Sequence, residues 1–458
     1  MAEPISPLSG FPEWLPGQRI VEQRLLDRIR ERFERFGFTP IETRAVEPLR
    51  YLLAKGETDK EIYVLRRLQA EPGEADSELG LHFDLTVPFA RYVAQHRHQL
   101  VFPLRRYQIQ KAWRGERPQE GRYREFYQAD VDVIGDGELP LSHDAEMLAM
   151  LHDVLGALPI PPVRLLVSNR KVLEGAYRAL GIDDTHGVLR TVDKLDKIGE
   201  RGVHGLLTTN LRLPPSSAET CLALARMRGA DDSVATRVSG LGLRHELLET
   251  GLEELRFILR AARELPPDAI VIDLHIARGF DYYTGMVCEG VMVGHEDLGS
   301  IASGGRYDDL ASMGGGAKLP GIGVSIGVTR ILGRLFARDL LRASRQTPSC
   351  ALVALVSEET RGASDTIARQ LRARGIRCEV FDRPLKLGKQ IRHAEQKGIP
   401  FVWFPALEDR AASVRDIRSG VQTDADPAEW QPPVEDVEPA VLIGPDDRRS
   451  QATASRKR

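Results

Sequence analysis

Residues 105–135 read RRYQIQKAWRGERPQEGRYREFYQADVDVIG and carry the most informative pattern in the chain. Two runs of strand character flank a polar turn, which predicts two long antiparallel strands. Side chains alternate between the two faces of a strand. The even positions of the second strand are Arg122, Arg124, Phe126, Gln128, Asp130 and Asp132. The first strand places on one face, in the same way, Arg106, Gln108, Gln110 and Arg114.

Two interpretations of this polar face are open. An antiparallel sheet can turn one polar face to solvent, but such a face would favour lysine, glutamate and threonine. Arginine can grip phosphate or carboxylate through two parallel hydrogen bonds, which lysine cannot do. Phe126 adds a ring on which a base can stack. The mixture of arginine, glutamine and an aromatic ring therefore favours a binding floor.

Length and composition exclude several classes of protein. The chain has 458 residues, 42% of them hydrophobic and 28% charged, with a net charge of −3; this predicts two to four globular domains. It shows neither a signal pattern nor an apolar run near the roughly 20 residues of a membrane helix, so we expect a cytoplasmic protein with no membrane partner. The cysteines at 221, 288, 350 and 378 are too dispersed for a zinc cluster or a disulfide framework. We expect buried thiols and no metal site among the protein's side chains.

Changes of pattern along the chain predict an α/β multi-domain protein with an antiparallel sheet core flanked by helices. Apolar spacing predicts a helix over residues 19–36. Strand–helix alternation near the C-terminus predicts a separate small α/β domain with a mixed sheet. The segments are a core in two parts (1–182 and 266–340), a helical insertion (183–265), a linker (341–348), the α/β domain (349–440) and a disordered tail (441–458).

The familiar glycine-rich phosphate loops are missing from the sequence. No GxxxxGK[ST] loop occurs, and PGIGVSIG at residues 320–327 is not GxGxxG, because its third glycine falls one position late. A nucleotide would therefore be held by side chains rather than by such a loop.

The segment WRGERPQEGRYREFYQ, residues 113–128, resembles the second signature motif of class II aminoacyl-tRNA synthetases in its histidine-specific form. The resemblance implies that Arg114 binds the ATP α-phosphate and the carboxylate that attacks it. It also implies that Phe126 stacks on adenine. Arg117 and Gln119 would then reach the acceptor end of histidine tRNA.

Four further segments fit the same family. LHFDLTVPFARY (81–92) carries Asp84 and Thr86, which would share one face if this were a strand; the position of Asp84 implies binding of the substrate α-amino group. Gln128 and Asp132 complete the histidine site, and Asp132 would accept a hydrogen bond from one ring nitrogen. In the segment 81–92, His82 stands where relatives commonly have arginine.

IARGFDYYTGMVCE (276–289) resembles a motif private to histidyl enzymes, with Phe280 in place of the usual leucine. The resemblance implies that Arg278 stabilises charge on the α-phosphate, that Tyr283 meets the imidazole and that Tyr282 lines the pocket. SGGRYDDL (303–310) also fits the family.

LPGIGVSIGVTRIL (319–332) is similar to the third motif of the class, in which Arg330 would lie against the γ-phosphate. The first motif is the weakest match, because Arg44 stands where relatives often have proline.

The resemblance spans about residues 5–440 and implies a two-step reaction. L-histidine would attack ATP, with Mg²⁺ neutralising the phosphates, and the histidyl group would pass to histidine tRNA. The resemblance also implies a homodimer and an anticodon-binding role for residues 349–440. One alternative is a regulatory-subunit paralogue of ATP phosphoribosyltransferase, but such paralogues usually lack the C-terminal domain and the RG-DYY residues. A general RNA-binding protein without chemistry would leave the Arg/Gln/Asp faces unexplained.

Overall fold

A computed structural model describes residues 5–53, 61–69, 78–276, 282–308, 318–407 and 410–444. The chain divides into two compact units. The core unit comprises Met1–Pro12 and Leu26–Arg334, and the C-terminal unit comprises Glu13–Leu25 and Leu335–Arg458. Helix α1 (Pro16–Arg35) contributes residues to both units.

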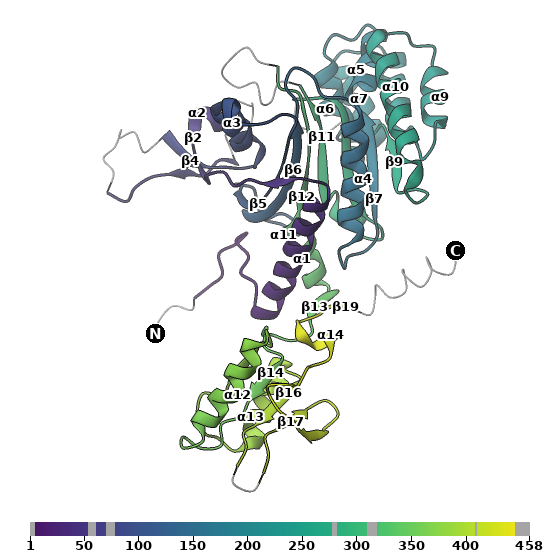
Figure 1. The fold of residues 1–458 in the computed structure, drawn as a ribbon. Coiled ribbons are helices and arrows are strands. Elements are labelled where there is room, and N and C mark those ends of the chain that lie inside the picture. Colours follow the sequence, from purple (N-terminus) through teal and green to yellow (C-terminus); the bar gives the residue numbers. More distant parts are fainter. Residues whose placement is uncertain are drawn as a thin grey trace. The chain divides into compact units, whose positions relative to one another are not determined.

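The core unit is built on a nine-stranded sheet in its described part (Figure 1). Neighbouring strands are antiparallel except for two parallel pairs, β1 with β5 and β7 with β9. The two long strands predicted around the polar turn are confirmed, and Gln110 pairs with Gln128 across them. Arg114, Arg122 and Arg124, which were predicted on these strands, lie instead in the connection between them, because β5 ends at Trp113 and β6 begins at Glu125. In sheet order the strands are β1 (Thr39–Pro40), β5 (Leu104–Trp113), β6 (Glu125–Ile134), β12 (Gly321–Gly327), β11 (Ala302–Tyr307), β10 (Tyr283–Met292), β7 (Val163–Asn169), β9 (Ile270–Asp273) and β8 (Arg228–Gly229).

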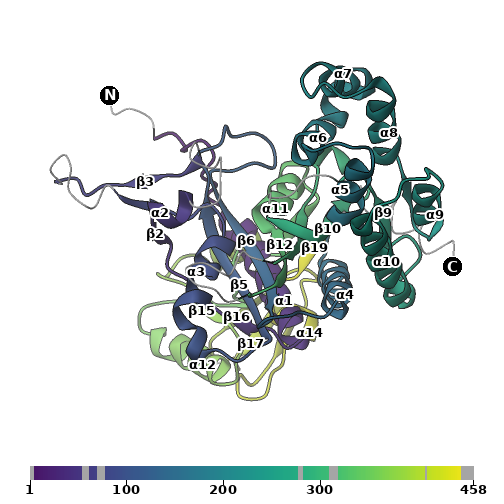
Figure 2. The same ribbon diagram turned by 90° about the horizontal axis from the view of Figure 1, so that it is seen from above.

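Helices α4 (Ser142–Gly156), α5 (Arg170–Ala179) and α10 (Glu246–Ala261) pack against this sheet, α4 on β7 and β12 and α5 on β10. Helices α5 and α10 pack closely at Gly175. A Cβ atom added there would lie 2.2 Å from the backbone nitrogen of Leu248. Figure 2 shows the insertion grouped beside them. It consists of α6 (Thr185–Val192), α7 (Leu195–Thr209), α8 (Pro215–Ala225) and α9 (Ser233–Ser239).

A three-stranded sheet adjoins the beginning of helix α3 (Thr86–His96). Its strands, in sheet order, are β2 (Val46–Pro48), β4 (Leu79–Leu81) and β3 (Val64–Leu65), and α2 (Leu49–Leu52) follows β2. The helix predicted over 19–36 is confirmed by α1, and its apolar spacing buries Leu25, Ile29 and Phe33.

The C-terminal unit contains a five-stranded mixed sheet between two helices. Its apolar side chains form two clusters, one including Ile367 and Leu371 of α12 (Arg361–Ala373) and the other including Ala394 of α13 (Leu387–Lys397). This agrees with the strand–helix alternation of the sequence. In sheet order the strands are β15 (Cys378–Val380), β14 (Ala351–Val353), β16 (Phe401–Phe404), β17 (Ser413–Asp416) and β18 (Gln422–Asp424).

The structure corrects three local predictions. Residues 341–343, expected in a linker, form β13 (Leu341–Ala343) and pair with β19 (Val441–Ile443), which was expected in a disordered tail. Pairing satisfies the backbone groups of both short segments, and Leu341 is buried. Residues 445–458 lie outside the described residues. Asp84 and Thr86 do not share a strand, because β4 ends at Leu81 and Thr86 begins α3.

Two global expectations can also be compared with the structure. The four cysteines are all buried and free, as the sequence predicted. Among the described residues, no helix is long and apolar enough to cross a membrane.

Candidate active site

A cavity of about 820 Å³ lies on the polar face of β6. All of the described residues that the sequence assigned to ligand binding line this cavity: Asp84, Thr86, Arg114, Arg117, Gln119, Phe126, Gln128, Asp132, Tyr282, Tyr283 and Arg330. Arg278, the remaining assigned residue, lies outside the described residues. Segments far apart in the sequence therefore converge on one site.

The polar face of β5 and β6 is buried toward the middle of the sheet. Arg106 is 0% exposed and Gln108 is 1% exposed. Asp130 and Asp132 are each 3% exposed. A solvated sheet face is therefore the wrong interpretation of these positions. Burying such groups costs free energy unless partners or a ligand compensate, which indicates a binding site.

Asp132 stands in a network of buried partners. Tyr307 donates its phenolic proton to Asp132 Oδ1 over 2.9 Å, and Arg106 Nη2 lies 2.7 Å from Oδ2. The Arg106 guanidinium also stacks 3.9 Å from the ring centroid of Phe89. Burial raises the pKa of Asp132, and Arg106 and Tyr307 oppose that shift. Gly323 faces Asp132 across the strands, and an added Cβ there would lie 2.0 Å from Oδ1, so only glycine leaves room for the carboxylate.

Three tyrosines form an aromatic wall beside this carboxylate. The ring centroids of Tyr282 and Tyr283 are 4.8 Å apart, and those of Tyr282 and Tyr307 are 6.3 Å apart. Burial raises the pKa of all three phenols above the ordinary value. They are therefore neutral hydroxyl groups near pH 7, able to donate and accept hydrogen bonds.

Two arginines mark another part of the cavity lining. Arg114 donates from Nε to the carbonyl oxygen of Phe83 over 2.9 Å, and its guanidinium lies 5.1 Å from the ring centroid of Phe126. Arg330 donates to the carbonyl oxygen of Leu298. These bonds to the backbone fix two cations on the cavity wall, one of them, Arg114, beside the ring of Phe126.

The loop before α3 supplies the remaining wall. Asp84 Oδ1 accepts a hydrogen bond from the backbone N–H of Val87 over 3.0 Å, so the carboxylate is held at the beginning of the helix. Gln128 donates to Ser325 Oγ over 2.8 Å. His82 is buried, with Nε2 2.7 Å from the carbonyl oxygen of Lys111. Its burial lowers the pKa of the imidazole, so the ring is neutral near pH 7.

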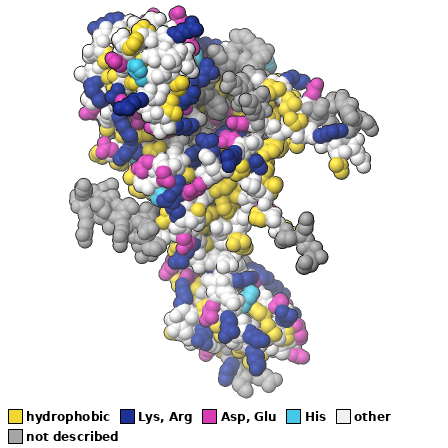
Figure 3. Space-filling model, turned by 180° about the vertical axis from the view of Figure 1, so that it is seen from behind, with side chains coloured by type: hydrophobic (Ala, Val, Ile, Leu, Met, Phe, Trp, Pro, Cys, Tyr) yellow, Lys and Arg dark blue, Asp and Glu magenta, His cyan; other side chains and the backbone are white. Residues whose placement is uncertain are grey.

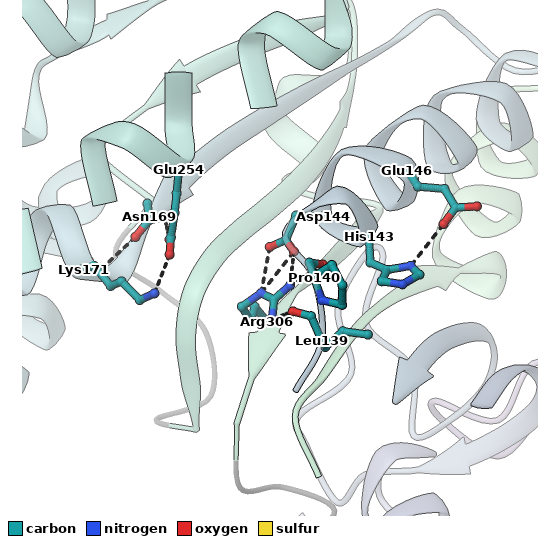
Figure 4. Close-up of polar contacts among 9 residues, drawn as sticks. All are labelled: Leu139, Pro140, His143, Asp144, Glu146, Asn169, Lys171, Glu254 and Arg306. Carbon is teal, nitrogen blue, oxygen red and sulfur yellow. Dashed lines mark hydrogen bonds and ion pairs between the residues drawn. The ribbon is translucent and has the colours of Figure 1, made fainter. Parts of the chain in front are cut away.

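The opposite face of the sheet is anchored by a buried ion pair (Figure 4). Arg306 donates to Asp144 Oδ1 over 3.1 Å and to the carbonyl oxygens of Leu139 and Pro140 over 3.0 and 3.2 Å. Because side chains alternate along β11, Arg306 faces α4 while its neighbour Tyr307 faces the cavity. The pair therefore ties the strand carrying Tyr307 to the beginning of α4.

Figure 4 also shows a second polar cluster, between the beginning of α5 and α10. Asn169 donates to Glu254 Oε2 over 2.7 Å, and Lys171 pairs with the same carboxylate. This cluster links the end of β7 and the beginning of α5 to helix α10.

Sequence reasoning left several site residues without a role. Asp130, Tyr307 and Ser325 all line the cavity. All three lie in segments already singled out, and the alternation of β6 places Asp130 on the polar face. The partners Arg306 and Asp144 left no local pattern, since they are 162 residues apart.

Comparisons with known proteins agree with this geometry. Residues 10–331 match the family described as Histidyl-tRNA synthetase, and residues 350–430 match the family described as Anticodon binding domain. The chain is 51% identical over 449 residues to the histidine–tRNA ligase of Cutibacterium acnes, a match covering 96% of this chain and 99% of that one.

Solved structures give the same result. The histidyl-tRNA synthetase of Nostoc sp. PCC 7120 superposes with a TM-score of 0.83 at 35% identity, covering 92% of this chain and 97% of that chain. A Bacillus halodurans protein described as an ATP phosphoribosyltransferase regulatory subunit/histidyl-tRNA synthetase has a TM-score of 0.67 at 22% identity, covering 86% of this chain and 96% of that chain. That likeness shows the fold alone, so the regulatory-subunit alternative gains no support from it. The chain belongs to the histidyl-tRNA synthetase family.

Proposed function

We propose that the cavity on the polar face of β6 binds L-histidine and ATP together and joins them as histidyl-adenylate. As a family member, the chain is an aminoacyl-tRNA synthetase, a ligase that uses ATP to attach histidine to tRNA. One observation supports the location of the reaction. The described residues assigned to histidine, to ATP and to the tRNA acceptor end all line the same cavity.

Histidine is held at both ends in this proposal. Asp84, Thr86 and Gln128 bind the α-ammonium group, and a carboxylate suits such a cation. Asp132 and Tyr283 meet the two ring nitrogens. A buried site built to hydrogen-bond its substrate rejects analogues strongly, because a wrong ligand leaves polar groups unpaired.

ATP lies along the arginines. Phe126 stacks on adenine, Arg114 holds the α-phosphate together with the histidine carboxylate, and Arg330 lies against the γ-phosphate. A carboxylate oxygen of histidine then forms a bond to the α-phosphorus as the bond to pyrophosphate breaks. Arg114 and Arg278 stabilise the charge that develops there, and fixed donors of this kind contribute strongly to catalysis.

Magnesium fits this site as a companion of the ATP phosphates. Among the described residues, no three His, Cys, Asp or Glu side chains are grouped so that they could hold a metal ion. Mg²⁺ in phosphate sites usually takes one or two carboxylates besides phosphate and water. Glu116 and Glu289 line the cavity, and we expect them to supply these ligands. The ion would neutralise phosphate charge.

The tRNA is expected to contact both units. Arg117 and Gln119, in the loop between β5 and β6, reach its acceptor end. The C-terminal unit reads the anticodon, consistent with its match to an anticodon-binding domain. Figure 3 shows Lys and Arg side chains on the visible face of this unit with acidic side chains among them. Local basic patches would therefore carry the contacts despite the net charge of −3.

Exchange of labelled pyrophosphate into ATP tests the proposal. The exchange should depend on L-histidine and on no other standard amino acid, and charging of total tRNA should label histidine tRNA alone. Equal exchange with another amino acid would overturn the proposed substrate.

The resemblance further predicts a two-fold homodimer, the commonest closed assembly. Light scattering at micromolar concentration should give twice the chain mass of 51.0 kDa. An active preparation with the mass of one chain would contradict this prediction.

A further inference from the structure

The connection between β5 and β6 contains a hairpin with Glu120 and Gly121 at its tip. Gln119 and Arg122 exchange backbone hydrogen bonds of 3.3 and 2.8 Å on either side of this tip. Gly121 has a φ of 74°, a backbone conformation that glycine adopts at little cost. Gln119, Gly121 and Arg122 line the cavity, whereas Glu120 lies outside its lining. The hairpin tip therefore borders the cavity while its one carboxylate has a different partner.

That partner is a buried arginine of helix α11 (Val328–Ala337). Nε of Arg334 lies 3.1 Å from Glu120 Oε1, and its Nη2 donates to Asp297 Oδ2 over 2.9 Å. The Arg334 side chain is 3% exposed, whereas those of Glu120 and Asp297 are 54% and 62% exposed. A cation near the C-terminus of a helix interacts favourably with the helix dipole, but it can do so from the surface. Burying its charge is costly unless partners compensate, so the two carboxylates account for this arginine better than the helix end does.

The other partner of Arg334 belongs to the short helix η6 (Glu296–Leu298), which lies between β10 and β11. Arg330, one helical turn before Arg334, donates to the carbonyl oxygen of Leu298 in the same short helix. The hairpin tip packs on η6 as well. A Cβ atom added at Gly121 would lie 2.5 Å from Cδ1 of Leu298. Arg334 therefore lies where the hairpin tip, η6 and α11 meet.

We propose that Arg334 is a positioning residue for transfer of the histidyl group to tRNA. Its pair with Glu120 holds the hairpin tip, and with it Gln119, in one place beside the cavity. This inference rests on the proposed contact of Gln119 with the tRNA acceptor end. In the transfer, a ribose hydroxyl of the tRNA forms an ester bond to the histidyl carbonyl carbon, the bond to AMP breaks, and AMP and a proton are released. A misplacement of about 1 Å can slow such a step by about 10²-fold, so a fixed tip matters most when tRNA is bound.

The test measures two rates on the same preparations. One is histidine-dependent pyrophosphate exchange without tRNA, and the other is single-turnover transfer from preformed histidyl-adenylate to histidine tRNA. Arg334→Met and Glu120→Ala should each slow transfer about 10-fold, while exchange by Glu120→Ala stays within about twofold of wild type. Arg334→Met also releases η6, to which Arg330 is bonded, so its exchange should fall by a few-fold at most. The double variant should transfer no more slowly than the slower single variant, because both changes break the same contact.

Arg338→Met is the matched control, because this exposed arginine directly follows α11 and its loss should change neither rate. If Arg334→Met does not fold, Glu120→Ala alters only a half-exposed side chain and gives the same comparison. Wild-type transfer in the folded variants, equal losses of exchange and transfer, or fully additive losses in the double variant would overturn the role of Arg334. Gln119→Ala shows which proposal fails, because wild-type transfer in that variant would overturn the tRNA contact on which the inference rests.

Discussion

The sheet of the core unit and the sheet of the C-terminal unit bury different kinds of side chain. On the first, Arg106, Asp130 and Asp132 are at most 3% exposed. On the second, the buried positions are apolar, such as Val402 and Trp403, both 0% exposed. Each sheet is packed by helices, so the difference does not follow from architecture.

The difference indicates where chemistry takes place. Apolar burial stabilises a fold directly, whereas buried charges are costly unless they are paired or used. The core unit keeps such charges beside a cavity, whereas the C-terminal unit buries its charged residues Glu22, Arg345 and Asp436 outside the strands of its five-stranded sheet. We therefore assign activation of histidine to the core unit and a surface contact with tRNA to the C-terminal unit.

The largest effect is expected at the buried pair behind the site. Asp144→Ala leaves Arg306 as an uncompensated buried charge, which should cost about 3–5 kcal/mol of unfolding free energy. Denaturant unfolding measures the loss. Asp153→Ala, on the same helix, removes a partly exposed pair with Arg32 and should cost at most about 1 kcal/mol. Equal losses in the two variants would mean that the buried charges need no partner.

The next effect sharpens the assignment to one face of β5. Arg114→Ala should reduce histidine-dependent exchange by about 10²-fold or more, as loss of a charge-stabilising donor does, and Arg114→Lys should recover little. Arg105 lies on β5, which Arg114 directly follows, and Arg105 pairs with Glu146. Arg105→Ala should leave the exchange rate per folded molecule within a few-fold of wild type. A large loss in both variants would show that the strand, rather than its polar face, is what matters.

The structure also shows how much of the fold and the site could be predicted from the sequence. The period-two pattern predicted the polar face of β6 from Phe126 to Asp132, although Arg122 and Arg124 lie before this strand. The described residues that the motifs assigned to ligands all line the cavity. The sequence could not predict that Tyr307 donates a hydrogen bond to Asp132. The two residues are 175 positions apart, and their strands β11 and β6 are separated by β12 in the sheet. The sequence left open whether Asp84 lies on a strand; in the structure β4 ends at Leu81, and the Asp84 carboxylate accepts from Val87 at the beginning of α3.

A smaller effect concerns the cost of burying Asp130. Its pKa is raised to about 7 in the folded chain, above the unfolded value of about 3.9. The folded state therefore holds this proton more tightly, and its contribution to stability falls as pH rises between these two values. Asp130→Asn has no carboxyl group to titrate at this position. Its free energy of unfolding, relative to that of the wild type, should therefore rise by about 2 kcal/mol between pH 5 and pH 6.5. Parallel unfolding curves at the two pH values test this, and a constant difference would contradict it.

The smallest effect belongs to the surface of the C-terminal unit. Lys389 and Arg392 are exposed on α13. Reversing both charges should raise the KM for histidine tRNA about tenfold and flatten its salt dependence, since fewer counterions are released. Exchange without tRNA should not change. Unaltered charging at physiological salt would place the tRNA contact elsewhere on the unit.

A crystal structure of the chain with L-histidine and a non-hydrolysable ATP analogue tests the central claim most directly. The account predicts that the adenine ring stacks on Phe126, that phosphate contacts Arg114, and that the imidazole lies over β6 with its ring nitrogens within hydrogen-bonding distance of Asp132 and Tyr283. Histidine bound away from the polar face of β6 would contradict the account.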